Sequence, residues 1–440
     1  MAHAISLHER EMIYQMAQAG WTDQAIAEKL GRHRLTVLKW RRRALGGQGA
    51  KEGGHRGRPY TGDLSTFPAE VREVVGQWRR AHPGWGAKTL RAELEVQGMR
   101  PLPSVASLNR WLRSAGLVRR NRRHSSLPVE APGSEKICHQ VWQLDARGCE
   151  MVAGVGVVSV IDVKDVASRV TIMSQPCVVG GSAGHRLDTQ DYQLALRRAF
   201  TEWGLPDVIT GDHDSIFYDN GSPSPFPTRF HLWLVALGIS LRFIRLHCPT
   251  QHAIVERSHQ VIYAQALEKQ HFENLSHLEH VLDHRRHFLN SSLPCRSLQN
   301  RPPLQATPLA ILPRRCYRPE CEADLLDLSR IWLYLERGHW FRSASTLGTV
   351  ALGGVTYCLG PAFSRRQVRI TFQASTRLFC FDPLDGSSPL TRPLQGISIS
   401  FLMGDLAHLT SGTPFQLCLP FAWDQLRMIF LVNLLSGSSP

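Results

Sequence analysis

Apolar residues at helical spacing predict two groups of short helices in the first third of the chain. In residues 5–45, Ile13 and Met16 share one face of a first helix, and Ser6 can cap the start of that helix. Thr22 can cap a second helix, and Gly31 permits a tight turn before a third helix with the sequence RHRLTVLKWRRR. The pattern predicts a helix-turn-helix domain; a three-helix bundle with a solvated basic face is the alternative. The third helix would offer DNA the side chains of Arg32, Arg34, Thr36, Lys39 and Arg41.

A second helical group occupies residues 67–118. Val71, Val75 and Trp78 lie on one face of a helix that ends before Pro83, and HPGWGAKTLRAELE and VASLNRWLRSAG follow as two more helices, the last with Ser104 as its cap. This pattern predicts a second helix-turn-helix domain, in which the basic residues that would contact DNA are Lys88 and Arg110.

Two linkers without apolar periodicity flank the second group. Residues 46–66 are rich in Gly and Arg, and Arg56 and Arg58 in the sequence RGRP fit insertion into an A·T minor groove, although a plain flexible tether fits equally well. Residues 119–137 form a basic, then Ser- and Pro-containing, linker.

The pattern changes to strands from Val141 onward. VWQLDARG, VAGVGVVSVIDV and ASRVTIMSQ read as three strands, followed by a helix, the strand DVIT, the helix FHLWLVALG, the strand SLRFI and the long helix AIVERSHQVIYAQALEKQ. This order predicts an α/β core of the ribonuclease H-like type within residues 138–312.

Strand patterns return in residues 338–404. VTYCLG, QVRITF, TRLFCF and ISISF alternate apolar and polar residues, and Asp385-Gly386 is a hairpin signal. We therefore expect a small C-terminal β-barrel of the SH3-like type. Residues 413–440 form an apolar tail to which the sequence assigns no role.

The distribution of charge along the chain predicts a binding partner. The 440 residues include 51 Lys and Arg against 37 Asp and Glu, and residues 1–137 hold 24 of the basic residues against 12 of the acidic ones. A basic front third predicts a polyanionic partner, of which double-stranded DNA is the commonest.

Other classes of protein are disfavoured. The start has no signal-peptide pattern, the apolar run Met428–Leu435 is too short to span a bilayer, and the ten cysteines include no CxxC pair. These features predict a cytosolic protein, nucleoid-associated in a bacterium, with no membrane partner. No GxxxxGK[ST] motif is present, so no nucleotide cofactor is expected.

Three carboxylates fall where an α/β core of this type would gather them. Asp145 lies on the first strand, Asp212 follows the fourth, and Glu256 lies on the last helix. Phosphodiester chemistry needs an activated oxygen nucleophile and a neutralised leaving oxygen, which two Mg²⁺ ions roughly 4 Å apart supply. Because hard cations prefer carboxylate oxygens, the three residues are candidate catalytic residues and metal ligands for Mg²⁺, with Mn²⁺ as a substitute.

The segments around these carboxylates resemble those of DDE transposases of bacterial insertion sequences, which have a retroviral-integrase-like core. The matching pieces are WQLDARG, ITGDHDSIF and PTQHAIVERSHQ, with Asn290 and RPP (Arg301–Pro303) further on, and the resemblance covers most of residues 5–404. It implies a polynucleotidyl transferase that cleaves element ends and joins them to target DNA, and that works as a homo-oligomer on DNA.

The sequence departs from the family pattern near the second carboxylate. His213-Asp214 stands where the family has Asn-Gly, so Asp214 remains an alternative to Asp212. For Asp162 and Asp165 we expect turn or supporting roles. Arg257, His259 and Gln260 surround Glu256 and could touch substrate phosphate or simply form a polar helix face.

Two other functions compete with transposition. One is a catalytically silent, transposase-derived DNA-binding regulator, and the other is a ribonuclease H-type nuclease without strand transfer. The intact set of three carboxylates favours catalysis over the first, and the paired helix-turn-helix patterns favour site recognition over the second.

Overall fold

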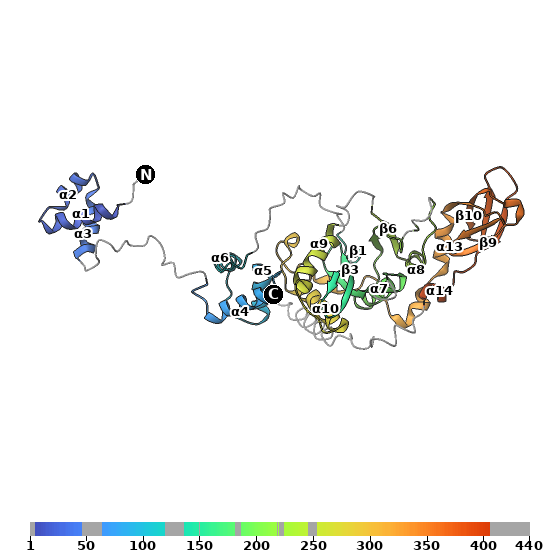
Figure 1. Ribbon diagram of the computed structural model, residues 1–440, viewed down its shortest axis with the longest axis horizontal. Coiled ribbons are helices and arrows are strands. Elements are labelled where there is room, and N and C mark those ends of the chain that lie inside the picture. The colour runs from blue at the N-terminus through green and yellow to red at the C-terminus, as the bar shows by residue number, and fades with distance from the viewer. Residues whose placement is uncertain are drawn as a thin grey trace, which may run out of the picture. The chain divides into compact units, whose positions relative to one another are not determined.

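A computed structural model describes residues 5–45, 64–118, 136–148, 150–180, 186–217, 219, 224–244 and 253–404 (Figure 1). These residues belong to two compact units, one ending at Thr66 and the other beginning at Phe67. Arg56 and Arg58, most of both predicted linkers, and the tail 413–440 lie outside the described residues.

The described residues of the first unit form three helices, as predicted. They are α1 (Leu7–Gln18), α2 (Asp23–Leu30) and α3 (Arg34–Leu45). The Ser6 side chain accepts a hydrogen bond from the backbone of Glu9 and the Glu9 carboxylate accepts one from Ser6 N, which is a capping box. The Thr22 hydroxyl caps α2, and Gly31 ends it at φ 59°. These local signals fix the helix ends, and the buried side chains of Ile13, Ile26 and Val37 hold the helices together.

The second helical group also forms as predicted. Its helices are α4 (Ala69–Ala81), α5 (Ala87–Val96) and α6 (Val105–Ser114). Val75, Leu90 and Leu108 are fully buried, and the Ser104 hydroxyl caps α6 by accepting from Ser107 N. Unlike the first three helices, this group is part of the same compact unit as the rest of the chain.

Six strands form the central sheet of the described chain. They are β1 (Val141–Ala146), β2 (Glu150–Val152), β3 (Gly156–Asp165), β4 (Thr171–Val178), β5 (Val208–Gly211) and β6 (Ser240–Phe243). β3 pairs antiparallel with β1, β2 and β4, whereas β5 pairs parallel with both β1 and β6. An antiparallel trio extended by parallel strands is the ribonuclease H-like layout that the sequence predicted.

One predicted strand is interrupted. VAGVGVVSVIDV contains the end of β2, a turn and most of β3, because Gly154 and Gly156 have φ values of 85° and 111°. A Cβ atom on Gly154 would lie 1.6 Å from the Phe272 carbonyl oxygen, so this close approach requires glycine. The resulting hairpin leaves β3 long enough to run beside β1.

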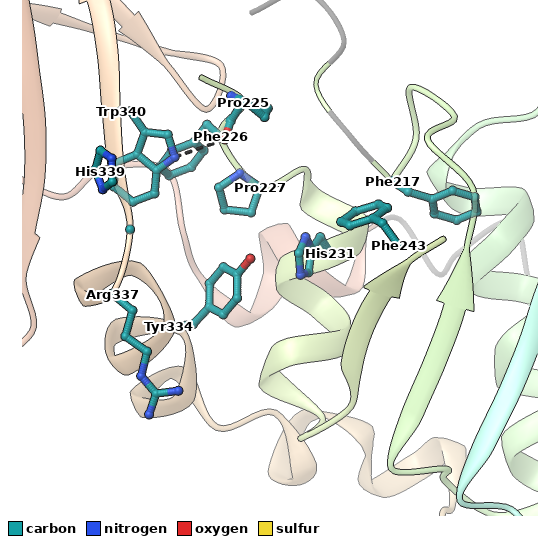
Figure 2. A pocket seen from close by; sticks show the side chains of 11 residues that line it. Phe217, Pro225, Phe226, Pro227, His231, Phe243, Tyr334, Arg337, His339 and Trp340 are labelled. Carbon is teal, nitrogen blue, oxygen red and sulfur yellow. Dashed lines mark hydrogen bonds between the residues drawn. The ribbon is translucent and has the colours of Figure 1, made fainter. Parts of the chain in front are cut away.

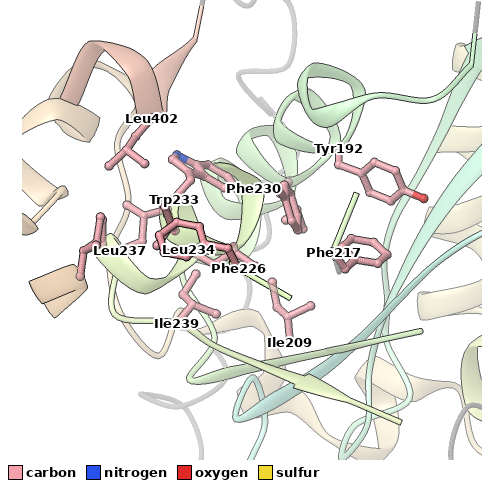
Figure 3. Close-up of a cluster of buried hydrophobic side chains, with 14 of the residues drawn as sticks. Tyr192, Ile209, Phe217, Phe226, Phe230, Trp233, Leu234, Leu237, Ile239 and Leu402 are labelled. Carbon is pink, nitrogen blue, oxygen red and sulfur yellow. The ribbon is translucent and has the colours of Figure 1, made fainter. Parts of the chain in front are cut away.

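Helices pack on both faces of this sheet. Trp142, Leu144 and Ile161 belong to a buried cluster with α7 (Thr189–Trp203) and α8 (Arg229–Ala236), part of which Figure 3 shows. Val158 and Val160 belong to a separate cluster with α9 (Ala253–Ile262), the π-helical turn Tyr263–Leu267 and α10 (Leu275–Ser291). The predicted long last helix of the core is therefore α9 continued by a π-helical turn.

The C-terminal part contains strands but no closed barrel among its described residues. A four-stranded sheet has the order β12-β11-β10-β7, and a separate hairpin pairs β8 with β9. No described pairing joins β12 to β7, so the predicted barrel is not confirmed. The strands are β7 (His339–Ser343), β8 (Thr349–Leu352), β9 (Val355–Cys358), β10 (Gln367–Gln373), β11 (Leu378–Pro383) and β12 (Leu390–Pro393).

The prediction of a strand at ISISF was wrong. This segment begins the short helix α14 (Ile399–Met403), because the Ser398 hydroxyl accepts a hydrogen bond from Phe401 N and Gly404 ends the helix at φ 71°. Leu402 is fully buried in the large core cluster, where α14 contacts α8. Tertiary burial and an N-cap therefore prevailed over the alternating pattern.

The described helices include none whose length and apolarity would allow it to cross a membrane.

Candidate functional site

The parallel pairing of β1 with β5 aligns the first two predicted carboxylates. Gln143 pairs with Thr210 in this ladder, and continuing the same register by two residues brings Asp145 level with Asp212. Neighbouring strands are about 4.8 Å apart, so residues at one level of the register are close neighbours. The sheet thus brings together two carboxylates that are far apart in the sequence.

A buried glutamine ties the helix of the third carboxylate to the same strand. The Gln143 side chain is only 4% exposed, and its Oε1 accepts a hydrogen bond from Val255 N at 3.0 Å. Val255 immediately precedes Glu256 in the first turn of α9, where the backbone N–H groups have no partner within the helix. Gln143 therefore satisfies a helix-end donor and fixes α9 against β1.

Sequence reasoning did not single out Gln143. Its only signal was the alternation of a strand, which places Gln143 on the same face of β1 as Asp145. A polar side chain on that face, two residues before a candidate catalytic carboxylate, is a reasonable marker of a supporting role.

The electrostatics of Asp145 show that the predicted carboxylates influence one another. Burial raises the Asp145 pKa most, the negative charges of Asp212, Asp162 and Glu256 contribute in the same direction, and together they bring it to about 7. A carboxylate that is hard to ionise beside other carboxylates gains from a cation that neutralises the group.

The donor chemistry of this group fits a hard divalent cation, because such cations prefer carboxylate oxygens. In the described part of the chain, no three His, Cys, Asp or Glu side chains are arranged to hold a metal ion. Glu256 is exposed, and residues 245–252 before α9 lie outside the described ranges. Asp145, Asp212 and Glu256 therefore stay predictions as metal ligands.

The alternative second ligand, Asp214, has a local role. Its Oδ1 accepts hydrogen bonds from Ile216 N at 3.0 Å and the Ser215 hydroxyl at 3.3 Å, while its own N–H donates to Asp212 Oδ1 at 3.0 Å. Asp214 is exposed in a turn, whereas Asp212 follows β5 directly. Asp212 therefore stays the predicted second ligand, with Asp214 as the alternative.

The two aspartates of β3 differ. Asp165 accepts hydrogen bonds from His139 N and Ser168 N, which confirms its predicted turn role. Asp162 lies within β3 rather than in a turn, 1% exposed and directly opposite Asp145.

The residues around Glu256 on α9 also separate into two kinds. His259 is partly buried, and its ring nitrogens lie near Asp145 and Asp162. Arg257 and Gln260 are exposed and joined by a hydrogen bond of 2.7 Å. Only the histidine faces the carboxylates of the sheet.

The predicted DNA-contacting residues of α3 have different surroundings. Arg34 and Lys39 are exposed and Thr36 is partly exposed. Arg32 instead pairs with Glu9 at 2.8 Å, and Arg41 pairs with Asp23 at 3.0 Å. The exposed residues are available to a polyanion, whereas the paired ones also hold the three helices together.

The second helical group uses much of its surface to contact the core. Glu93 and Arg285 form a buried ion pair, and Trp85 Nε1 donates to the Gln265 carbonyl at 3.1 Å. The Arg285 guanidinium lies 4.5 Å from the centre of the Trp85 ring. Gln265 belongs to the π-helical turn that continues α9. The group therefore contacts the continuation of the helix that bears Glu256.

The candidate DNA contacts of this group are both exposed. Lys88 Nζ donates to Asn300 Oδ1 at 2.8 Å, so it also links α5 to the segment after α10. Arg110 lies on α6 and donates to Ser107 Oγ at 3.4 Å. A role of either residue in DNA binding stays a prediction.

A cavity of about 300 Å³ lies apart from the carboxylates, where α8 and the helix α13 (Leu328–Glu336) meet β7 (Figure 2). Trp340 Nε1 closes one side by donating to the Pro225 carbonyl at 3.1 Å. Its described lining includes three phenylalanines, Tyr334 and Trp340, together with the polar residues His231 and Arg337. None of the three predicted carboxylates is among the described lining residues.

Two segments of the chain match known protein families. Residues 237–303 match the integrase core domain family, and residues 9–51 match the homeodomain-like domain family. The first match contains Glu256, Asn290 and Arg301–Pro303, but neither Asp145 nor Asp212. A DNA-binding domain followed by an integrase core fits a DDE transposase, which confirms the resemblance seen in the sequence.

Solved structures similar to the chain include viral integrases. The intasome of simian T-cell lymphotropic virus matches with 14% identity and a TM-score of 0.32, over 72% of this chain and 95% of that chain. The catalytic core domain of HTLV-2 integrase, solved with magnesium, matches with 14% identity and a TM-score of 0.28, over 39% and 97% of the two chains.

Proposed function

We propose that the protein is a DNA transposase that cleaves the ends of a mobile element and joins them to target DNA. One observation carries this proposal: Gln143 pairs with Thr210 in the ladder of β1 with β5, two residues before Asp145 and Asp212, and also ties the helix that bears Glu256 to β1. The integrase core and homeodomain-like matches support the same class of reaction.

DNA recognition in this proposal begins with α3. Arg34 and Lys39 are exposed on it, and Thr36 lies between them. Lysine and arginine contacts to phosphate fix the register of a helix in the major groove, and polar side chains read base edges. The first three helices would thus select the terminal repeats, with Arg56, Arg58, Lys88 and Arg110 as further predicted contacts.

Asp145, Asp212 and Glu256 would together hold the divalent cation. When bound, Mg²⁺ or Mn²⁺ would neutralise charge on the attacking and leaving oxygens of a phosphodiester. Gln143 keeps Glu256 near the sheet through the backbone of α9. Burial and the neighbouring carboxylates both raise the Asp145 pKa, so a bound cation would stabilise the ionised cluster.

The two reactions need no external energy source. In cleavage, a water oxygen attacks the phosphorus, and the bond from phosphorus to the 3′-oxygen breaks to leave a 3′-hydroxyl. In joining, that hydroxyl attacks a target phosphodiester, and one phosphorus–oxygen bond forms as another breaks. Pairing two element ends at one target would require at least two copies of the core, so we expect a homo-oligomer on DNA.

The decisive experiment is strand cleavage of DNA that carries the flanking sequence of the gene, in Mg²⁺ or Mn²⁺. Glu256→Gln should abolish cleavage but keep DNA binding, because the change removes a charge and preserves size. Denaturing gels would measure cleavage, and fluorescence anisotropy would measure binding. Retained cleavage in this variant would remove Glu256 from the active site.

Asp212→Asn and Asp214→Asn form a matched pair in the same assay. We expect loss of cleavage in the first variant and near-normal cleavage in the second, because the Asp214 side chain serves its own turn. The reverse result would move the second ligand to Asp214.

Salt dependence tests the helix-turn-helix domain. Arg34→Ala and Lys39→Ala should each lower the slope of log K against log salt by about 1, as the loss of one phosphate contact requires. Arg32→Ala is the comparison variant, since Arg32 pairs with Glu9 and its loss should also lower the stability of the first unit. Unchanged slopes in the first two variants would contradict docking through this face of α3.

The same cleavage assay separates the two competing functions. Binding of the flanking DNA without any cleavage would support a DNA-binding regulator. Cleavage that never produces joined products would support a nuclease of the ribonuclease H type.

A further inference from the structure

A polar triad lies at the junction of β1, β3 and α9. Asp145 and Asp162 are directly opposite each other on the antiparallel strands β1 and β3. His259 of α9 lies between them, with Nδ1 3.8 Å from Asp145 Oδ2 and Nε2 3.4 Å from Asp162 Oδ2. Like charges directly opposite in a sheet repel each other, so the placement of an imidazole between these two carboxylates requires an explanation.

The burial of Asp162 is the second observation. Its side chain is 1% exposed, and Oδ1 accepts a hydrogen bond from the Ser174 hydroxyl. Oδ2 is buried without a hydrogen-bond partner and faces the ring of His259. A buried carboxylate oxygen is costly unless a polar group meets it, and the imidazole is the group that the fold places there.

The position of His259 connects this pair to the proposed catalytic group. His259 follows Glu256 by three residues on α9, so the two side chains lie on neighbouring positions of one helix face. Gln143 ties the first turn of α9 to β1, and His259 meets both β1 and β3 one turn later. The contacts of Gln143 and His259 together fix the distance of α9 from the sheet and its rotation about its own axis.

We propose that Asp162 is a positioning residue, which orients the His259 ring so that it supports Asp145 and holds Glu256 at the metal-binding edge. This inference rests on the proposed function, because it assigns Asp162 to the machinery of the same site. Groups that orient the ligands of a metal site from the next layer of contacts are a recurrent arrangement, and the loss of one typically costs about 10–100-fold in metal affinity or activity.

The test uses Asp162→Asn, His259→Asn and the double variant of the full chain. Mn²⁺ binding without DNA is measured by electron paramagnetic resonance, and DNA cleavage is measured in parallel. We expect each single variant to weaken Mn²⁺ binding by about 10–100-fold. Because Asp162 acts through His259, the double variant should be no worse than His259→Asn.

A merely structural role would give a different result. In that case thermal unfolding would shift while Mn²⁺ affinity stayed unchanged in the folded protein, and the proposal would fail. It would also fail if the two losses of affinity added up, since Asp162 would then act independently of His259. Should Asp162→Asn not fold, His259→Asn alone decides, because unaltered Mn²⁺ affinity in it removes the link to Asp145.

The two proposals fail separately. If the natural protein binds Mn²⁺ in the expected Asp162- and His259-dependent manner but never cuts DNA, transposition fails and the positioning role stands. If it cuts DNA with unchanged Mn²⁺ affinity in both single variants, the reverse holds. A natural protein that binds no Mn²⁺ overturns the positioning role.

Discussion

The two helical groups of this protein are alike in sequence pattern and different in what their side chains contact. Each has three short helices, a Ser or Thr cap and a basic surface. In the first group, ion pairs form within the group itself, between Arg32 and Glu9 and between Arg41 and Asp23. The second directs Glu93 and Trp85 at Arg285 and Gln265 of the core.

This difference shows that a helix-turn-helix pattern does not determine how a module is used. The first group belongs to its own compact unit and leaves Arg34 and Lys39 exposed. The second group buries α5 residues against the core, directly behind the helix of Glu256, which makes it part of the scaffold of the candidate site as well as a candidate DNA reader. Four experiments would break or sharpen this comparison.

The largest effect is expected from the buried ion pair. Glu93→Ala should lower the free energy of unfolding of the second unit by about 3–5 kcal/mol, because Arg285 would be left buried without its partner. Glu9→Ala, which removes the partly exposed pair with Arg32 and the capping-box contact to Ser6, should cost less, about 1 kcal/mol. Urea unfolding of both variants measures the difference, and similar small losses would show that the docked arrangement does not persist in solution.

A smaller effect is expected at Trp85. Trp85→Phe keeps the ring beside Arg285 but removes the N–H that the buried Gln265 carbonyl accepts, at a cost of about 1–3 kcal/mol. Trp21→Phe in the first unit is the control, since Trp21 is 39% exposed and should change stability by less than about 0.5 kcal/mol. Thermal unfolding compares the two variants; equal shifts would argue against docking through Trp85.

The helix caps of the two groups should contribute equally to stability. Thr22→Ala and Ser104→Ala each remove a hydroxyl that accepts a backbone hydrogen bond at a helix start, and each should cost about 1 kcal/mol. Chemical denaturation monitored separately for each unit measures both. A clear inequality would mean that docking of the second group changes the energetics of its helix ends.

The smallest effect is a pH dependence specific to the first unit. Hydrogen bonds from Ser6 and Arg32 lower the Glu9 pKa from 4.5 to about 2. A lowered carboxyl pKa stabilises the fold above the ordinary pKa, and that stabilisation is lost as pH falls from about 4.5 towards about 2. Nuclear magnetic resonance titration of Glu9 checks this, with Arg32→Ala as the comparison; an ordinary pKa in the natural protein would contradict the capping box and ion pair.

Much of the molecule was determined by local sequence. Ser6, Thr22 and Ser104 mark helix starts, Gly31 marks a helix end, and these signals act within a few residues, so the helices of both groups were predictable. The order of strands and helices in the core could also be predicted from the sequence, because buried strands and amphipathic helices differ in the spacing of their apolar residues. The three carboxylates stood out because they occurred at the expected places in that order.

Only the tertiary structure decided how distant residues combine. Gln143 meets Val255, Asp162 faces His259, and Glu93 meets Arg285, each across more than 90 residues of sequence. ISISF became a helix because Leu402 is buried against the core, although its local alternation favoured a strand. Local signals fix backbone conformation within a few residues, whereas register, burial and charge pairing depend on which surfaces the whole chain brings together.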